Sequence, residues 1–226
     1  MKVKRIALYG GTFDPVHNGH MSVAHALLQL FALDEVVFIP AHVAPHKRDQ
    51  FVSPALKRYA MLALATQAEA RMRVSTFELD APERPYTVET LARMKERYGQ
   101  EARLFFVMGA DSWTDIKTWR EWERVLKLTN HIVMTRPGYE LEAAHVTDEI
   151  RERMVDIRGV GAEEIARRVD ESDAEKIYVT DAVQMAVSAT QVRKLVRLGL
   201  DKEWPALVPQ PVAEFIEKYR LYRDKA

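Results

Sequence analysis

Two histidines lie close together behind a glycine turn near the start of the chain. The stretch GGTFDPVHNGH occupies residues 10–20, directly after the apolar run at residues 6–9. Within it, His17 and His20 are three positions apart with Gly19 between them, so both side chains share one face if a helix begins here. Such a pair can bind a metal ion, relay a proton or donate hydrogen bonds to an anion. A purely structural role, in which one histidine caps or packs the turn, is the alternative.

The glycines of this stretch fit a phosphate-binding turn. Gly10 and Gly11 allow a tight turn and a close backbone approach, and the amides at a helix start attract phosphate. The stretch is not a P-loop, because no Gly-Lys-Ser or Gly-Lys-Thr follows, and its glycine spacing differs from the dinucleotide-binding fingerprint. A zinc site would need three or four protein ligands, and no third ligand is evident nearby.

A second group of anion-binding residues precedes a helical segment near the end of the chain. In the stretch 187–190, Ser188 or Thr190 is a candidate N-cap, with the amides of the first helical turn beneath it. Arg193 lies three positions after Thr190 and shares its face. The hydroxyl, the amides and the guanidinium fork can therefore converge on one phosphate. The alternative is a capped helix with a solvated arginine.

Three further segments carry polar groups that suit ligands. Thr87, in the stretch PYTVETL, is a candidate N-cap, and the partial positive charge of a helix start favours a carboxylate over a neutral carboxamide. Gly109 and Asp111 follow a strand-like run, where a glycine and an acid suit hydrogen bonds to ribose hydroxyls. Lys47 lies in a proline-bounded loop and by itself indicates only surface charge.

The elements that must position these residues are short apolar runs alternating with segments of helical period. Strands are predicted at 6–9, 36–40, 72–77, 104–109, 131–135 and 176–179, and helices at 21–30, 55–67, 87–98, 190–198 and 212–222. The alternation predicts right-handed crossovers and an α/β fold, a Rossmann-like open parallel sheet with helices on both faces. Ligands then bind at the carboxyl ends of the strands, where GGTFDPVHNGH lies. The charged stretch 140–176 is predicted to form helices or loops outside the sheet.

The composition limits the class of protein. The chain has 226 residues, 47% of them hydrophobic, which is enough for one large domain with a substantial core. Its 33 basic and 33 acidic residues balance, so no overall basic field would hold a nucleic acid or an anionic membrane. Because there is no cysteine, disulfides and thiolate zinc sites are excluded. The first apolar run is too short for a signal peptide or a membrane span, so a cytoplasmic protein is expected.

The stretch GGTFDPVHNGH resembles the H-x-G-H signature of the nucleotidyltransferase superfamily, in the form found in bacterial nicotinate mononucleotide adenylyltransferases. Other blocks are similar to those of this family in the same order: FIPAHVAPHK (38–47), PYTVETL (85–91), FVMGADSW (106–113), TW (118–119), TRPGY (135–139), VSATQVR (187–193) and LYR (221–223). Together they cover nearly the whole chain. Ala189 stands where the family often has serine, and the segment from about 144 to 173 matches none of its blocks.

The resemblance implies a single nucleotidyltransferase domain over residues 1–226, with a C-terminal helical portion from about 188 that completes the ATP site. It implies adenylyl transfer from ATP to nicotinate mononucleotide, giving nicotinate adenine dinucleotide and pyrophosphate in NAD biosynthesis. The cofactor would be Mg²⁺, held mainly by the ATP phosphates without a protein metal site. The partners would be ATP and nicotinate mononucleotide, with no nucleic acid and no membrane, and a homo-oligomer is compatible with the sequence.

The resemblance also assigns residues to sites. His17, His20, Lys47 and Arg193 would be catalytic, as donors and positioners for the phosphates, with His20 acting on the developing charge. A phosphate dianion is already a competent nucleophile, so no general base is required. The implied ATP-binding residues are Gly10, Gly11, Thr12, Phe13, His17, His20, Gly109, Asp111, Ser188, Thr190 and Arg193. The implied residues for nicotinate mononucleotide are Thr12, Lys47, Thr87, Trp119, Arg120 and Arg136, with the Trp119 ring stacked on the pyridine or, alternatively, packed in the core.

Three other functions are less consistent with the sequence. A sister transferase making dephospho-coenzyme A or a cytidine-diphospho alcohol would give no reason for the Thr87 and Trp119 blocks. A class I aminoacyl-tRNA synthetase would need a Lys-Met-Ser-Lys-Ser-like loop, and the chain is short and net neutral. A nucleotide-binding protein without turnover would have no need of the four residues assigned to catalysis.

Overall fold

Seven strands among the described residues form one sheet in which every neighbouring pair is parallel, in the order β3-β2-β1-β4-β5-β7-β6. The structure is a computed structural model and describes residues 3–42, 52–81, 85–135, 140–172, 174–182 and 187–223. The strands are β1 (Lys4–Gly11), β2 (Glu35–Pro40), β3 (Met72–Val74), β4 (Ala102–Gly109), β5 (Asn130–Met134), β6 (Met154–Asp156) and β7 (Ile177–Thr180). The strand order confirms the predicted open parallel sheet.

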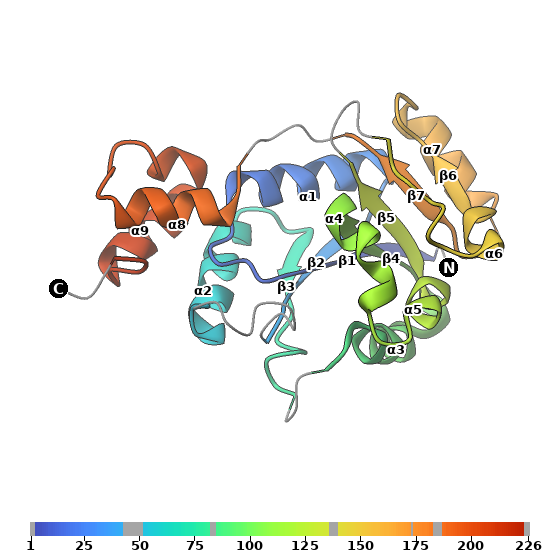
Figure 1. Ribbon diagram of the computed structural model, residues 1–226, viewed down its shortest axis with the longest axis horizontal. Helices are drawn as coiled ribbons and strands as arrows, with labels where there is room; N and C mark the ends of the chain where they lie inside the picture. Colours follow the sequence, from blue (N-terminus) through green and yellow to red (C-terminus); the bar gives the residue numbers. More distant parts are fainter. Residues whose placement is uncertain are drawn as a thin grey trace.

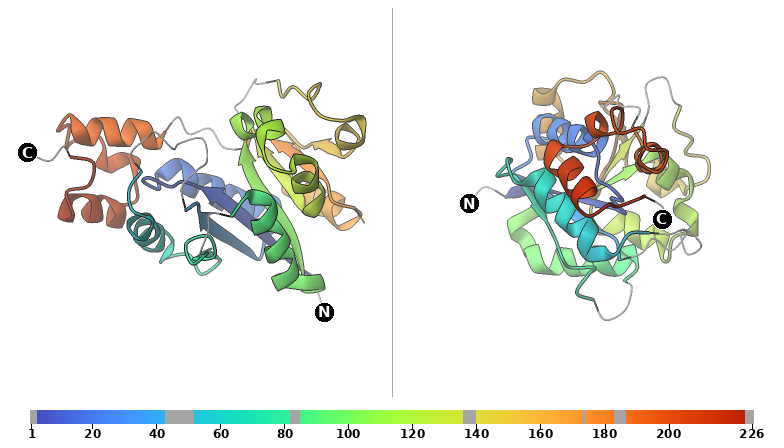
Figure 2. Two further views of the ribbon diagram at one scale, coloured as in Figure 1. Left: turned by 60° about the horizontal axis from the view of Figure 1, so that its bottom comes forward. Right: turned by 90° about the vertical axis from the view of Figure 1, so that its left-hand side faces the viewer.

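Helices cover both faces of this sheet (Figures 1 and 2). They are α1 (Asn18–Leu30), α2 (Ala55–Thr66), α3 (Thr87–Tyr98), α4 (Ala110–Thr114), α5 (Trp122–Leu128), α6 (Asp148–Arg151), α7 (Ala162–Asp170), α8 (Ala189–Arg197) and α9 (Gln210–Lys218). Alternate strand residues face opposite layers. The side of Ala7 and Phe105 packs against α1, α2 and α7, and its core continues into α8 and α9. The side of Leu8 and Phe106 packs against α3, α4, α5 and α6.

All six predicted strands and all five predicted helices are present, most with ends shifted by one to three residues. The strand predicted at 72–77 ends earlier, at Val74, because the Ser75 hydroxyl accepts a hydrogen bond from the Phe77 amide and turns the chain. The prediction that residues 140–176 lie outside the sheet is wrong for β6. This three-residue strand pairs with β7 at the sheet edge.

The two C-terminal helices lie beside each other at one end of the sheet (Figures 1 and 2). Helix α9 contacts α2, and the Asn18 side chain at the start of α1 donates a hydrogen bond to the carbonyl of Ala206 in the short 3-10 helix Pro205–Leu207 (2.9 Å). The C-terminal helical portion therefore packs against the element that carries the histidines. Among the described residues, no helix is both long enough and apolar enough to cross a membrane.

A buried histidine at the start of β5 gives the fold an acid-sensitive group. His131 is fully buried, its Nδ1 hydrogen-bonds the Thr129 carbonyl (3.0 Å), and burial lowers the pKa of its imidazole to about 3. The unfolded chain takes up a proton near pH 6.5, whereas the folded chain does not until about pH 3. Stability is therefore lost as the pH falls below about 6.5.

We expect His131 to account for about 2 kcal/mol of the folding stability lost between pH 7 and pH 5. His131→Leu should remove that share of the loss, whereas the same change at the exposed His25 should leave it in place. Urea unfolding of the three proteins at both pH values measures the difference. An equal loss in wild type and His131→Leu would show that the imidazole is not held neutral in the fold.

Candidate active site

The two histidines of the glycine-rich stretch stack on each other at the start of α1. His17 is the N-cap residue, and its ring lies 3.6 Å from that of His20, measured between centroids, at an interplanar angle of 23°. The His17 amide donates a hydrogen bond to His20 Nδ1 (3.2 Å). Because Nδ1 is the acceptor, a neutral His20 carries its proton on Nε2. The loop therefore fixes His20 as an Nε2–H donor.

Two glycines make room for this arrangement. A Cβ on Gly19 would lie 3.0 Å from Nδ1 of His17, and a Cβ on Gly11 would lie 2.8 Å from the Phe13 ring. Phe13 has a φ of 50°, in the left-handed region, and its buried ring contacts His20 edge-on with centroids 5.0 Å apart. Because the Phe13 side chain is used in this packing, only its backbone is available to the predicted ATP contact.

His17 is held as a neutral imidazole. Burial lowers its pKa to about 4, and its Nδ1 has no hydrogen-bond partner among the described residues. At neutral pH this side chain therefore acts as a donor through a single N–H and carries no positive charge.

The start of α8 lies against the same loop. The Gln191 amide donates to the Ser188 hydroxyl (3.1 Å), so Ser188 is the N-cap and Thr190 is not. Arg193 donates through one guanidinium nitrogen to the Asp14 carbonyl (2.7 Å) and through the other to Thr190 Oγ1 (3.3 Å). The predicted shared face of Thr190 and Arg193 is confirmed, and the structure brings both to the histidine loop.

Asp14, which sequence reasoning did not single out, ties this loop to two other segments. Its carboxylate accepts hydrogen bonds from the Ser53 amide (2.9 Å) and from the Tyr222 hydroxyl (2.6 Å). Burial and the nearby Asp14 charge raise the pKa of Tyr222, so its phenol remains a donor. The carboxylate of Asp14 thus has a structural partner on each oxygen, while its carbonyl positions Arg193.

The first turn of α3 and the segment of Trp119 lie next to each other, as the resemblance implied. The Arg120 guanidinium carbon lies 4.7 Å from the centroid of the Tyr86 ring, a cation–π contact that joins the two segments. The prediction that Thr87 caps the helix is wrong. Tyr86 is the N-cap, and the Glu89 carboxylate accepts a hydrogen bond from the Tyr86 amide (2.9 Å). Thr87 is therefore the first helical residue, and its own amide belongs to the first turn.

The Trp119 ring is half-buried and packs on the core beside α3. Its centroid lies 6.3 Å from that of Phe106, with the rings at 76°. Trp113, by contrast, is fully buried, and its indole N–H donates to the Glu142 carbonyl (2.8 Å). Of the two, only Trp119 keeps ring surface available for a ligand.

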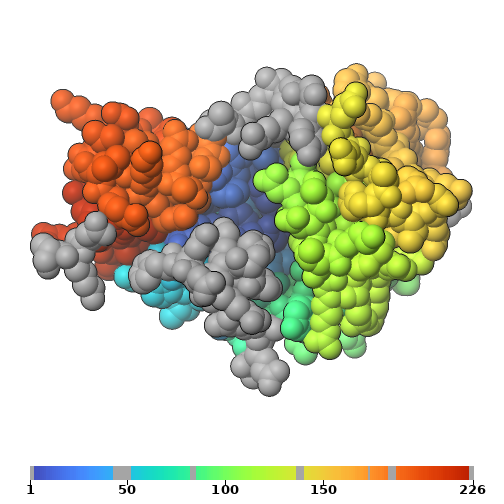
Figure 3. Space-filling view, viewed as in Figure 1, coloured from blue at the N-terminus to red at the C-terminus, as the bar shows by residue number. Residues whose placement is uncertain are grey.

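These groups gather where the strand order reverses. β1 pairs with β2 on one side and with β4 on the other, so the loop after β1 and the Gly109–Asp111 segment after β4 share one edge of the sheet. Open parallel sheets bind ligands at such a point. Figure 3 shows the blue N-terminal part at the bottom of a depression between the orange C-terminal helices and the light-green segment after β4.

Two predicted residues, Lys47 and Arg136, lie outside the described residues. In the part of the chain that the structure describes, no cluster of three or more histidines, cysteines or acids could hold a metal ion. The arrangement of the histidine pair, Thr12 and Arg193 offers hydrogen-bond donors and positive charge, which suits phosphate oxygens.

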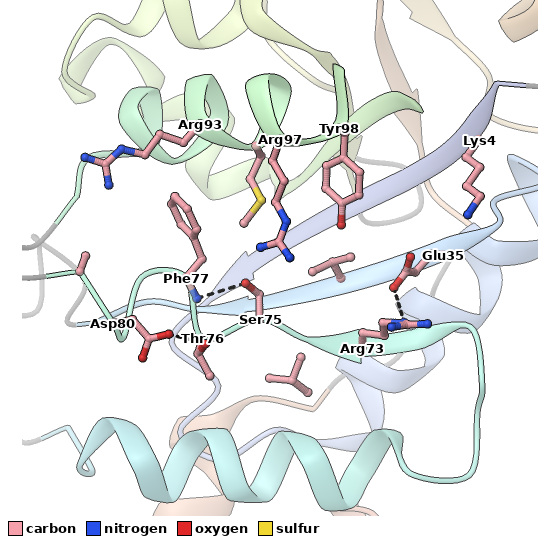
Figure 4. Close-up of a pocket in the computed structure, with 14 residues that line it drawn as sticks. Lys4, Glu35, Arg73, Ser75, Thr76, Phe77, Asp80, Arg93, Arg97 and Tyr98 are labelled. Carbon is pink, nitrogen blue, oxygen red and sulfur yellow. Dashed lines mark hydrogen bonds and ion pairs between the residues drawn. The ribbon is translucent and has the colours of Figure 1, made fainter. Parts of the chain in front are cut away.

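A cavity of about 740 Å³ lies elsewhere, between β3 and α3 (Figure 4). It is lined by Arg73, which pairs with Glu35 (2.8 Å), by Tyr98, and by Arg93 and Arg97 of α3. None of the predicted site residues lines it, so it is separate from the histidine loop.

The sequence matches the cytidylyltransferase-like family over residues 8–195. It is 34% identical to a probable nicotinate-nucleotide adenylyltransferase of Thermoanaerobacter sp. (strain X514), over 97% of this chain and 94% of that protein. A protein of Corynebacterium jeikeium (strain K411) with the same description is 36% identical, over 94% of this chain and 98% of its own length.

Among solved structures, the fold is similar to that of the Plasmodium falciparum nicotinic acid mononucleotide adenylyltransferase complexed with NaAD. The TM-score is 0.70 at 19% identity, and the match covers 97% of each chain. At this identity the likeness concerns the fold, which it confirms as that of a nucleotidyltransferase.

Proposed function

The chain belongs to the cytidylyltransferase-like family and, within it, to the nicotinate-nucleotide adenylyltransferases, and from this premise we propose that it transfers the adenylyl group of ATP to nicotinate mononucleotide. The products are nicotinate adenine dinucleotide and pyrophosphate, in NAD biosynthesis. The observation that carries this proposal is the 34–36% sequence identity, over nearly the whole chain, to proteins of that description. The stacked histidines and Arg193 at the switch point of the sheet support it.

The reaction is an in-line displacement at phosphorus. A phosphate oxygen of nicotinate mononucleotide forms a bond to the α-phosphorus of ATP, and the bond from that phosphorus to the α,β-bridging oxygen breaks. The bridging oxygen leaves with the electron pair as part of pyrophosphate. The attacking dianion has no proton to lose, so the protein contributes orientation and charge stabilisation.

The residues around the histidine loop supply that stabilisation. His20 Nε2–H donates to the charge that develops on the transferring phosphate, and the Arg193 fork holds the ATP phosphates beside Thr190 and Ser188. The amides after Gly10 and Gly11 and those at the start of α1 complete the phosphate cradle. The C-terminal helical portion from about residue 188 thereby completes the ATP site of the 1–226 domain.

The second substrate lies on the other side of the switch point. The first-turn amides of α3 at Thr87 bind the nicotinate carboxylate, with Arg120 close by, and the Trp119 ring stacks on the pyridine. Lys47 and Arg136, which lie outside the described residues, are assigned to this substrate by the resemblance alone. Asp111 lies exposed in the first turn of α4, directly after β4, and in this proposal it hydrogen-bonds the ATP ribose.

Mg²⁺ would fit this site only when it is bound to the substrate phosphates. It prefers oxygen ligands, above all carboxylates, whereas the side chains around the loop are imidazoles, a guanidinium and neutral hydroxyls, and the Asp14 carboxylate is already hydrogen-bonded on both oxygens. Phosphate oxygens would therefore hold it, and it would neutralise charge on the leaving pyrophosphate.

The test of the function is direct. Purified protein is incubated with ATP, Mg²⁺ and nicotinate mononucleotide, and the products are separated by chromatography. Formation of nicotinate adenine dinucleotide with equimolar pyrophosphate is expected. Conversion of a pantetheine phosphate or of cytidine triphosphate in place of these substrates would overturn the proposal.

We expect Arg193→Ala to raise the KM for ATP by about tenfold or more, because a charge-assisted hydrogen bond is worth about 1.5–3 kcal/mol. The KM for nicotinate mononucleotide should change much less. Arg193→Lys should recover only part of the loss, since lysine keeps the charge and loses the planar fork. Steady-state kinetics with each substrate varied in turn gives both constants. Equal effects on the two substrates, or full recovery with lysine, would contradict phosphate binding by Arg193.

A further inference from the structure

A fully buried arginine near the start of α2 holds three separate backbone segments at one point. Arg58 Nε donates to the Ser53 carbonyl (3.0 Å), and its two terminal nitrogens donate to the carbonyls of Thr12 and His42 (2.8 Å each). Among the described residues no carboxylate forms an ion pair with it, and desolvation lowers the pKa of its guanidinium. The nearby charges of Asp14 and Glu78 oppose that shift.

A glutamate on the far side of His42 continues this set of contacts. The Glu78 carboxylate accepts a hydrogen bond from the Thr90 hydroxyl (2.8 Å). Burial raises the pKa of this carboxyl, and the nearby His42 amide opposes that rise. His42 thus lies between the two side chains, with Arg58 hydrogen-bonded to its carbonyl and the Glu78 charge beside its amide. Thr90 lies in the first turn of α3, three residues after Thr87.

The contacts pass around the carboxyl edge of the sheet from one helical layer to the other. α2, which carries Arg58, packs on one face, and α3, which carries Thr90, packs on the opposite face. His42 lies two residues after the end of β2, the strand that pairs with β1 and β3. At one end the contacts reach Thr12 in the phosphate loop, and at the other the helix start assigned to the nicotinate carboxylate.

We propose that Arg58 and Glu78 are positioning residues that set the ATP site and the pyridine site at the distance that in-line transfer requires. We call the contacts from Thr12 through Arg58, His42 and Glu78 to Thr90 the edge clamp. Neither side chain touches a substrate in this proposal, which rests on the proposed function. Burying the charged guanidinium of Arg58 costs free energy. A neutral side chain would fill the same space without that cost if Arg58 served only to pack one loop.

The edge clamp predicts a kinetic effect that a role in stabilising the fold alone does not predict. A displacement of about 1 Å between reacting groups can cost about 100-fold in rate, while each substrate still binds its own half of the site. Loss of the clamp should therefore lower kcat more than it raises the dissociation constant of either substrate.

The test compares Arg58→Lys, Glu78→Gln and Thr90→Val with wild type. Lysine keeps the charge of Arg58 but cannot reach three carbonyls in a planar fork. Glutamine keeps one acceptor of Glu78 and sets an NH₂ group against a donor, and valine removes the Thr90 hydroxyl at nearly constant volume. We expect kcat to fall tenfold or more in the first two variants and severalfold in the third, with each dissociation constant, measured calorimetrically for the single substrates, within about threefold of wild type.

Arg5→Lys is the matched control. Arg5 is also buried and donates to the Phe31 and Ala166 carbonyls, and unlike Arg58 it also forms an ion pair with Asp170. It lies at the amino end of β1, away from the site. We expect both Arg5→Lys and Arg58→Lys to lower the thermal stability, and we expect Arg5→Lys to leave kcat unchanged. A wild-type kcat in folded Arg58→Lys and Glu78→Gln would overturn the proposal. So would a selective loss of binding of one substrate, which would indicate direct contact.

Amide hydrogen exchange tests the edge clamp independently of enzymatic activity. In Glu78→Gln the amide of His42 should exchange at least about tenfold faster, since the negative charge beside it is lost, while amides in the centre of β4 keep their rates. Unchanged exchange at His42 would overturn the clamp even in an active enzyme. If wild type made no nicotinate adenine dinucleotide, the proposed function would fail, and the exchange rates would still decide whether the clamp exists.

Discussion

Replacing His20 with alanine is expected to lower kcat by about 100-fold or more, the usual cost of removing one preorganised donor from a developing charge. The His17 amide holds His20 Nδ1, so the donor is fixed in place before substrate arrives. His20→Asn should lose as much, because its amide oxygen can accept from His17 but no group reaches the position of Nε2. His20→Gln, which carries an N–H at about that distance, should recover part of the rate.

The exposed His25, on the same helix, provides the control for His20. His25→Ala should leave kcat unchanged, and circular dichroism should show that all variants are folded. Near-normal turnover in folded His20→Ala would refute the role of this donor. Zinc in the purified protein, together with loss of activity on adding a zinc chelator in excess Mg²⁺, would support the metal alternative instead.

The second large effect concerns the choice between nicotinate and nicotinamide mononucleotide. If first-turn amides of α3 bind the carboxylate, the carboxamide would set its NH₂ against donors in a partly buried site. Unpaired buried polar groups cost about 1–3 kcal/mol each, so two such contacts give a preference of about 100-fold or more for the acid. The ratio of the two kcat/KM values measures this preference.

Thr87→Pro should bring the ratio of the kcat/KM values for nicotinate and nicotinamide mononucleotide close to one. Thr87 is the first residue of α3, a position where proline is well tolerated, and the preceding Tyr86 already has an extended backbone that suits a following proline. The substitution therefore removes one amide donor and leaves the helix intact. Thr87→Ala, which keeps the amide, is the matched control and should retain the preference.

Trp119→Ala should act differently, because stacking does not distinguish the acid from the amide. Both mononucleotides should bind more weakly by a similar factor, with most of the preference kept. The assignment to α3 fails if wild type uses the two substrates equally well. It also fails if Trp119→Ala alone abolishes the preference.

The sheet was predictable because its central strands are covered on both faces. β1, β2, β4 and β5 each contain a short apolar run, and their buried apolar residues divide between the two cores. β6 is only three residues long and lies at the edge, so neither its length nor its composition marks it as a strand. α7 lies within the stretch predicted to form helices or loops, but its bounds were not predicted. They carry a signal that could have been used: Gly161 before the helix, acids in its first turn and arginines in its last.

The site was predictable where one short stretch carries the chemistry, as around His17, His20 and Arg193. Arg58 was not predictable, because an arginine in an amphipathic helix indicates a solvated face. Its burial depends on three carbonyls from separate segments, which only the fold brings together. Asp14 and Glu78 were missed for the same reason. The assignments of Lys47 and Arg136 rest on the resemblance alone and stay predictions.

The contacts of Asp14 also bear on the order in which the proposed active site assembles during folding. Asp14 meets Arg193 and Tyr222 across 179 and 208 positions of the chain, whereas the β1–β2 and β1–β4 pairings close much shorter loops. Contacts of such separation close the longest loops and form late. On the ribosome, a nascent chain can assemble most of its sheet before α8 and α9 emerge. The proposed phosphate site is therefore completed only when α8 joins the sheet whose first loop carries the histidines.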